Sequence, residues 1–332
     1  MLRRVAVVAV VAVVTVVVVG PAVAAPVQAQ HRELGTSFPA DFPMILDASL
    51  GTPLIGFGSD EGRIAHTPVI FLHGNNDTPY PTACNPLYGD MHDAAEYFLR
   101  RGYRPSELWG LGYQGDQCDL PADQTIRSSL AHTSAASVPD LRQFVHAVLD
   151  YTGAEQVDIV AHSLGGTVAR EWLRQDDAHS LVRRLVTVAS PHHGIINCSP
   201  VPENYWQLPA SGGFVPTSAV CVELGAVATP FLSTLNAGDE TPGPTRYLTI
   251  RNSDTDFVYL PFDDGGFPAV PALDRNGAPA DFARSSALTG ATNLSLDGQG
   301  IYDEPLGTAH LGIWNSPETW RAALAFLRRS GP

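Results

Sequence analysis

The chain has 332 residues, and 44% of them are hydrophobic, which is enough for the core of one large α/β domain or of two modest ones. Its formal net charge is −14 at pH 7, and this acidity argues against nucleic acid or an anionic membrane surface as a partner. The sequence contains no internal repeat, which argues against a solenoid.

The first 24 residues have the layout of a secretory signal peptide. Arginines at positions 3 and 4 precede an apolar run over residues 5–19, and Ala22-Val23-Ala24 provides a small-residue cleavage site. The apolar run is shorter than the ~20 residues that a bilayer-spanning helix needs. We therefore predict a signal peptide over residues 1–24, with Ala29 as an alternative cleavage site, and a secreted, extracellular protein.

After an N-terminal, Pro-rich segment over residues 25–66, strands alternate with helices along residues 67–330. Strands are predicted at residues 67–74, 108–113, 156–162, 185–189 and 247–250, and helices at residues 91–102, 138–152, 164–174 and 317–329. This alternation is typical of an α/β fold with a doubly wound, mostly parallel sheet. Functional groups of such a sheet lie at the carboxyl ends of its strands.

Two long stretches rich in Gly and Pro interrupt the alternation, at residues 190–245 and 263–300. The first contains several aromatic residues and two cysteines. We interpret residues 191–244, approximately, as a loop-rich cap inserted above the sheet, where a cap would contact the substrate. A loop that merely packs on the sheet edge is the alternative interpretation.

Four cysteines in an exported chain favour two disulfides over reactive thiols or a metal site. Of the three connectivities, we prefer the local pairs Cys84–Cys118 and Cys198–Cys221. Each would contribute about 3–4 kcal/mol in the chain-entropy model.

Residues 157–166 read Val-Asp-Ile-Val-Ala-His-Ser-Leu-Gly-Gly, a buried strand that ends in one serine and passes directly into a helix. This is the pattern of a nucleophile elbow, in which the serine lies at a sharp strand-to-helix turn. Small residues two before and two after Ser163, here Ala161 and Gly165, keep the backbones from clashing, although the usual residue at the first position is Gly. The pattern predicts Ser163 as a nucleophile, with the Leu164 N–H at a helix N-terminus and directed at a developing oxyanion.

A serine nucleophile needs a base and an acid that orients the base. Asp254 and Asp256 follow the strand at residues 247–250, and both are candidates for the acid. His310 lies where we predict a loop before the last helix. The order Ser, Asp, His is one that serine hydrolases use.

Eleven histidines are available, so position must decide which one is the base. His73 and His162 lie at strand ends beside other motif residues, where they cannot also present a ring to Ser163. His192 and His193 follow the strand at residues 185–189, where they are better placed to shape the pocket. His310 alone has the late position before the final helix, and we predict it as the base.

A second oxyanion donor is expected from the loop after the first central strand, which reads His73-Gly74-Asn75. In this geometry the residue after His-Gly donates its backbone N–H. Asn75 and Leu164 would therefore form the oxyanion hole, and losing one such donor typically costs ~3 kcal/mol of transition-state stabilisation.

The motifs at residues 73–75, 161–166, 190–194, 255–256 and 309–312 together resemble the secreted bacterial class 2 lipases of the α/β-hydrolase superfamily. Residues 73–166 are also similar to lipase-like extracellular polyhydroxybutyrate depolymerases. The likeness spans about residues 67–326, and the long insert before the final histidine departs from the family pattern. Thr-Asp-x-Val is a common form of the acid loop in lipase-like hydrolases, which favours Asp256 over Asp254. The resemblance implies the α/β-hydrolase fold, a Ser163, Asp256 and His310 triad, and an oxyanion hole of the Asn75 and Leu164 amides.

The resemblance implies a secreted triacylglycerol lipase or carboxylesterase that works through an acyl-enzyme on Ser163. A polyhydroxyalkanoate depolymerase and an exported acyltransferase are alternatives that use the same triad. A non-catalytic binding module is disfavoured, because all three triad residue types are present in order.

No cofactor and no metal are expected for this chemistry. The acidic residues Asp263, Asp264 and Asp297 lack recognisable calcium-ligand spacing, and we interpret them as solvated loops. The expected partner is an ester substrate, an acylglycerol or a polyester, with contact to a lipid interface. We expect no nucleic acid partner and a monomeric protein.

Overall fold

A seven-stranded sheet runs through the part of the chain that the computed structural model describes, namely residues 33–47, 52–86, 89–116, 118, 133–195, 217–225, 229–252, 285–296 and 308–329. The strand order is β3-β5-β4-β6-β7-β8-β9. β3 is antiparallel to β5, and all other neighbours are parallel. The bounds are β3 Ile55–Phe57, β4 Val69–Leu72, β5 Leu108–Gly112, β6 Val157–His162, β7 Val182–Val188, β8 Arg246–Asn252 and β9 Thr292–Leu296. The predicted doubly wound, mostly parallel sheet is confirmed.

The central strands are the ones that the sequence predicts most directly. All residues of β4, β5 and β6 are buried, since helices cover both faces of the sheet. A parallel strand buried on both faces is recognised as an unbroken apolar run, such as Val-Ile-Phe-Leu in β4.

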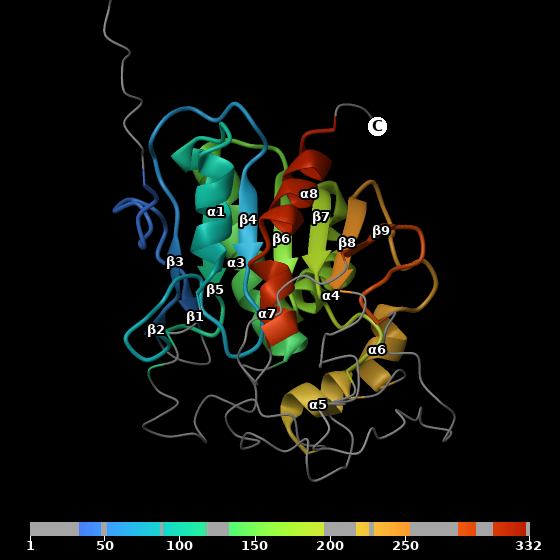
Figure 1. The fold of residues 1–332 in the computed structure, drawn as a ribbon. Helices are drawn as coiled ribbons and strands as arrows, with labels where there is room; N and C mark the ends of the chain where they lie inside the picture. Colours follow the sequence, from blue (N-terminus) through green and yellow to red (C-terminus); the bar gives the residue numbers. More distant parts are fainter. Residues whose placement is uncertain are drawn as a thin grey trace, which may run out of the picture. The chain divides into compact units, whose positions relative to one another are not determined.

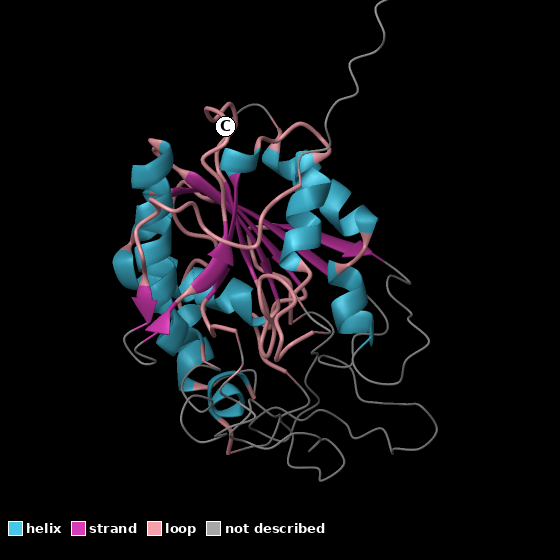
Figure 2. Ribbon diagram, turned by 90° about the vertical axis from the view of Figure 1, so that its left-hand side faces the viewer, coloured by secondary structure: helices cyan, strands magenta, loops and turns pink. Residues whose placement is uncertain are grey.

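Helices pack on both faces of this sheet (Figures 1 and 2). α1 (Met91–Leu99) and α8 (Pro317–Leu327) lie together on one face, and α3 (Ser134–Thr152) and α4 (Leu164–Asp176) lie together on the other. α3 begins after Thr133, whose side chain accepts the Ala136 N–H, and ends at Gly153 with φ 69°. Such a polar N-cap and left-handed glycine C-cap are the usual ends of a helix.

The structure contains two edge strands that the sequence analysis did not predict. β3 lies within the N-terminal segment of residues 25–66 and has only three residues. β9 reads Thr-Asn-Leu-Ser-Leu, and most of its residues are exposed. An edge strand with one open side does not show the continuous apolar run by which buried strands are recognised. A separate two-stranded ladder pairs β1 (Leu46–Asp47) with β2 (Thr52–Pro53).

The region predicted as a cap, about residues 191–244, contains two short helices, α5 (Ala219–Leu224) and α6 (Pro230–Leu235). Thr229 begins α6 by accepting the Leu232 N–H at 3.1 Å. Residues 196–216 and 226–228 lie outside the described residues, so the cap stays a prediction.

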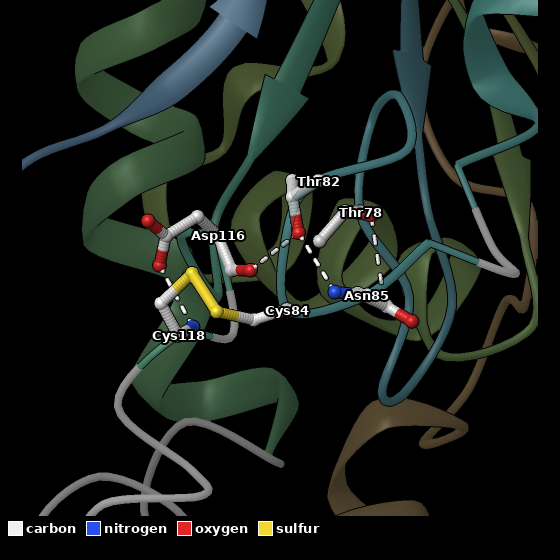
Figure 3. Close-up of a disulfide and its surroundings, with 6 residues drawn as sticks. All are labelled: Thr78, Thr82, Cys84, Asn85, Asp116 and Cys118. Carbon is white, nitrogen blue, oxygen red and sulfur yellow. Dashed lines mark hydrogen bonds between the residues drawn. A yellow bond between two sulfur atoms is a disulfide. The ribbon is translucent and has the colours of Figure 1, made fainter.

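The predicted disulfide Cys84–Cys118 is confirmed (Figure 3). It joins the segment between β4 and α1 to the segment that follows β5. Beside it, Thr82 donates its hydroxyl to the Asp116 carbonyl at 2.8 Å and accepts the Asn85 N–H at 3.0 Å. Cys221 is disulfide-bonded as well, whereas Cys198, its predicted partner, lies outside the described residues.

Across the described ranges, no helix is both long enough and apolar enough to cross a membrane. The same residues contain no group of three or more His, Cys, Asp or Glu side chains placed to hold a metal ion. Asp263, Asp264 and Asp297 lie outside them.

Candidate active site

Ser163 lies at the predicted strand-to-helix turn. β6 ends at His162, α4 begins at Leu164, and Ser163 between them has φ 50° and ψ −124°. A non-glycine residue with such a positive φ stores of the order of 1–3 kcal/mol of strain and persists only where its surroundings hold it. Here the Ser163 N–H donates to the Val188 carbonyl at 2.8 Å, and the Ser163 carbonyl accepts the Gly166 N–H at 3.0 Å. This strained turn has the geometry of a nucleophile elbow.

Small residues after Ser163 allow α4 to approach the neighbouring strands. A Cβ on Gly165 would lie 2.6 Å from the His73 carbonyl oxygen and 2.9 Å from the Leu72 carbonyl oxygen. A Cβ on Gly166 would lie 2.1 Å from Ser190 Oγ. Both distances to Gly165 involve backbone atoms at the end of β4, which cannot rotate away.

We expect the Gly165→Ala variant to lower the free energy of unfolding by about 3 kcal/mol, at the upper end of typical overpacking costs. The added methyl must push the end of β4 away from the start of α4. Urea unfolding at constant pH measures the change. Gly35→Ala is the matched control, because a Cβ there meets no atom within 4 Å. Equal stability of the two variants would contradict the packing argument.

His310 is the histidine that reaches Ser163. Its Nε2 lies 2.9 Å from Ser163 Oγ, although the two residues are 147 positions apart. The predicted loop position of His310 is wrong, because His310 lies in a short helix, α7 (Thr308–Trp314). The ring is directed at the serine because α7 packs beside β8 at the carboxyl edge of the sheet.

His162 supports His310 through a hydrogen bond and a ring contact, a role that the sequence analysis missed. Its Nε2 donates to the His310 carbonyl at 3.1 Å, and the two rings lie 4.8 Å apart. Burial, with the nearby His310 as a second cause, holds the pKa of His162 well below its usual value. The ring is therefore neutral, and the only local signal for its role was its position next to Ser163.

Both candidates for the acid of the predicted triad, Asp254 and Asp256, lie outside the described residues. β8 ends at Asn252 and is parallel to β7, which in turn is parallel to β6. The chain therefore leaves β8 at the same edge of the sheet as Ser163, two residues before Asp254.

The two predicted oxyanion donors belong to two different segments of the chain, and both segments lie next to Ser163. Leu164 is the first residue of α4, where a backbone N–H has no acceptor within the helix. The turn after β4 packs against the serine, since a Cβ on Gly74 would lie 3.0 Å from Ser163 Cβ. Asn75 follows Gly74 in this turn.

Among the contacts of the described residues, none joins His192 or His193 to Ser163. Both histidines instead form hydrogen bonds from the loop after β7. His192 Nε2 lies 3.0 Å from Thr187 Oγ1, and His193 Nε2 lies 2.7 Å from Glu240 Oε1. Burial alone would raise the pKa of Glu240, but hydrogen bonds from His193 and the Thr289 N–H lower it to about 2. These contacts fix the loop that follows β7 to Thr187 and to Glu240.

Two cavities bounded by described residues lie away from the elbow. One of about 420 Å³ is lined by Arg170, His179 and Tyr247, among others, and one of about 250 Å³ by Arg184, Arg246 and Arg329, among others. Neither includes Ser163 or His310 in its lining, so neither is the site of the predicted chemistry.

Helix α5 is fastened to the body of the molecule by Glu223. The carboxylate accepts the N–H groups of Ser134 at 2.6 Å and Ala135 at 3.1 Å, at the N-terminus of α3. Ser134 Oγ in turn lies 2.8 Å from Thr167 Oγ1 in α4. Burial raises the pKa of Glu223 to about 7, although the Ser134 and Ala135 N–H groups oppose the shift.

This raised pKa predicts a pH-dependent stability. The pKa of Glu223 in the folded protein, about 7, exceeds its ordinary value of 4.5. The contribution of Glu223 to the free energy of unfolding is therefore fully present below pH 4.5 and is lost as the pH rises through 7. Relative to Glu223→Gln, the wild type is expected to lose about 3 kcal/mol of unfolding free energy between pH 4.5 and pH 8. Urea unfolding of both proteins across this range measures it. A difference between the two proteins that stays constant with pH would contradict the assignment.

Comparison with known families agrees with this geometry. A family model described as lipase (class 2) matches residues 66–263, more than half of the 332 residues. The match includes the His73-Gly74-Asn75 segment and the elbow. His310 lies beyond it, so its assignment depends on the contact with Ser163.

A solved structure shows the same fold. The mature form of the Bacillus licheniformis lipase BlEst2 is similar with a TM-score of 0.50 at 19% identity, over 82% of this chain and 97% of that chain. Aspergillus fumigatus lipase B has a TM-score of 0.49 at 18% identity, over 89% of this chain and 56% of that chain. The chain thus spans little more than half the length of the fungal lipase.

The similarity to BlEst2, at 19% identity, shows the fold alone, which is the α/β-hydrolase fold predicted above. The family match is the stronger finding, and it supports a lipolytic carboxylic ester hydrolase that acts on an ester substrate. The elbow at Ser163 lies inside the matched segment. The chain belongs to the lipase (class 2) family.

Proposed function

We propose that the protein is a secreted serine hydrolase that cleaves carboxylic esters through an acyl-enzyme on Ser163. The observation that carries this proposal is the 2.9 Å contact of His310 Nε2 with Ser163 Oγ at the strained elbow. An alcohol this close to an imidazole nitrogen can pass its proton to the ring as it attacks. The family match supports an ester as the electrophile.

In the proposed reaction, Ser163 Oγ attacks the ester carbonyl carbon while His310 takes the serine proton. The Leu164 and Asn75 N–H groups bind the oxyanion of the tetrahedral intermediate. As the intermediate collapses, the bond to the alcohol oxygen breaks and His310 returns the proton to the leaving alcohol. Water then attacks the acyl carbon while His310 takes a proton from it. The bond from the acyl carbon to Ser163 Oγ breaks, His310 returns the proton to Ser163 Oγ, and the acid is released. Asp256 orients His310 and stabilises the charged ring.

The substrate class that we propose is the water-insoluble acylglycerols. The predicted signal peptide over residues 1–24 supports a location where such substrates are met as droplets or films. The predicted cap above the carboxyl edge supports a covered, apolar cleft for the acyl chain.

Hydrolysis rates on p-nitrophenyl esters from acetyl to palmitoyl, and on emulsified triacylglycerol, test this proposal. We expect a preference for the longer acyl chains and release of fatty acid from the emulsion. Soluble products from a polyhydroxybutyrate suspension, without hydrolysis of triacylglycerol, would instead identify a polyester depolymerase. A transfer product that outruns free acid when an alcohol is added would identify an acyltransferase. No activity on any of these esters would contradict the proposal.

A further inference from the structure

The cavity of about 250 Å³ lies at the edge of the sheet opposite to the proposed active site. Its lining includes Arg184, near the start of β7, and Arg246, the first residue of β8. Ser163 lies at the other end of β7, because its N–H donates to the Val188 carbonyl at 2.8 Å. The two places are therefore separate, and we call this cavity the arginine cavity.

Three arginines from different elements line the arginine cavity. Arg184 and Arg246 are register partners on the neighbouring parallel strands β7 and β8, so their Cα atoms lie about 5 Å apart. Arg329 follows α8, which packs against both strands (Figure 1). The guanidinium carbons of Arg184 and Arg329 lie 5.9 Å and 5.7 Å from the centroid of the Phe326 ring. Three positive side chains thus converge on one small space.

Arg184 is held in place by the end of α8. The residue is only 3% exposed, and its Nη1 and Nη2 donate to the Leu327 carbonyl at 3.2 Å and the Arg329 carbonyl at 2.6 Å. A guanidinium has more N–H groups than these two bonds use. Its Nε, for example, is buried and has no hydrogen-bond partner among the described residues. Arg184 is therefore fixed in position and still has hydrogen bonds to donate.

No carboxylate balances the positive charges inside the arginine cavity. Its lining contains no Asp or Glu among the described residues. The charge of Asp158 on β6 favours the ionised form of Arg184, but both carboxylate oxygens already accept hydrogen bonds from Arg183, which lies beside Arg184 in β7. Tyr247 in the lining is uncharged as well, because burial raises the pKa of its phenol to about 12.

Arg246 and Arg329 add to this imbalance. Neither side chain forms a hydrogen bond or an ion pair with another described residue. Burial lowers the pKa of Arg184, and the charges of Arg183 and Arg246 lower it further. Gathering like charges in this way is unfavourable, and it stands out in a chain whose formal net charge is −14. A bound anion would offset the repulsion.

The chemistry of the arginine cavity fits a phosphate group. Guanidinium groups bind phosphate oxygens through paired N–H groups. A phosphate dianion has enough oxygens and charge for three guanidinium groups, whereas one guanidinium already satisfies a carboxylate. Since a water takes about 30 Å³ of the liquid, the cavity has room for a phosphate ion or a small phosphate monoester.

We propose that the arginine cavity is a binding site for a phosphate group, which Arg184, Arg246 and Arg329 hold between β7, β8 and the end of α8. The inference goes beyond the proposed function and does not depend on it. A free phosphate ion and a small phosphate monoester present the same group to these arginines.

Isothermal titration calorimetry of the purified protein with inorganic phosphate, at neutral pH and constant ionic strength, tests the site. We expect a dissociation constant below about 1 mM. Glycerol 3-phosphate is titrated in parallel, and the tighter of the two compounds shows whether the site takes the free ion or a monoester. Acetate and chloride are expected to bind at least about tenfold more weakly, because neither offers several oxygens and two charges.

Arg246→Gln is the informative substitution, because this side chain is only partly buried and forms no hydrogen bond with another described residue. We expect the dissociation constant for phosphate to rise by about 10- to 100-fold, as the loss of a charge-assisted hydrogen bond predicts. Arg329→Gln should have the same effect, and it replaces Arg246→Gln if the latter does not melt cooperatively.

Arg321→Gln is the matched control, because it removes the same charge from α8 at a distance from the arginine cavity. Its side chain is 69% exposed and lies 3.7 Å from Glu318. We expect the dissociation constant for phosphate to stay within about twofold of the wild-type value, since solvent and salt screen an exposed charge.

No heat of binding from either phosphate compound would overturn the inference. Equal affinity of the wild type and Arg246→Gln for phosphate would place the ion elsewhere and overturn it as well. Acetate or chloride that binds as tightly as phosphate would show a general effect of charge instead of a phosphate site. The titration uses no ester, so a failure of the proposed function leaves its outcome unaffected.

Discussion

Replacing Ser163 by alanine is expected to lower kcat for ester hydrolysis by about 10⁴- to 10⁶-fold. The alanine has no oxygen to attack the carbonyl, so no acyl-enzyme forms, and the His310 Nε2 that lies 2.9 Å from Oγ loses its partner. Initial rates on the best p-nitrophenyl ester measure the effect. Labelling with a phosphonate, followed by mass analysis of the peptide that contains residue 163, should modify the wild type only.

Ser106→Ala is the matched control for this substitution. Ser106 is buried, and its Oγ has no hydrogen-bond partner among the described residues. We expect wild-type activity and labelling for this variant. Comparable activity of Ser163→Ala and Ser106→Ala would rule out the acyl-enzyme mechanism.

Replacing Asp256 by asparagine is expected to lower kcat by about 10⁴-fold while leaving the fold intact, as the loss of the orienting acid does in serine hydrolases. The amide no longer favours the histidine tautomer whose Nε2 can accept the serine proton, and it no longer stabilises the charged ring. The assay is the same ester hydrolysis, together with a thermal melt.

Asp254→Asn provides the comparison, because it removes the same charge two residues away. We expect it to retain activity within a few-fold of the wild type, since a carboxylate outside the triad has little effect on the reaction. The reverse pattern would assign Asp254 as the acid. Full activity of both variants would show that neither carboxylate orients His310, and it would contradict the predicted triad.

The elements that the sequence predicted are those with a strong local pattern. β4 is an apolar run because both faces of the central sheet are covered, and α3 has a polar cap, an apolar stripe and a terminal glycine. The strained turn at Ser163 was predictable for the same reason, since the small residue Gly165 must follow it closely. Local chemistry alone specifies each of these features.

Other elements carried no such pattern. β9 is an exposed edge strand with polar residues, and its place in the sheet depends on pairing with β8. The helix that carries His310 is only seven residues long and was predicted as a loop. A helix this short gains little from intrinsic propensity, and packing against its neighbours determines whether it forms.

By itself, the sequence determined the α/β alternation, the elbow at Ser163 and the identity of His310 as its partner. Strand and helix patterns and the order of motifs are properties of the sequence alone, so they can be recognised without the tertiary structure. Only the tertiary structure decided that His162 supports His310 and that Glu223 fastens α5 to the start of α3. The physical reason is that these roles depend on burial and on contacts between residues that are distant in sequence. A carboxylate or an imidazole acquires such a role only when the packed sheet and helices bring donors and acceptors within about 3 Å of it.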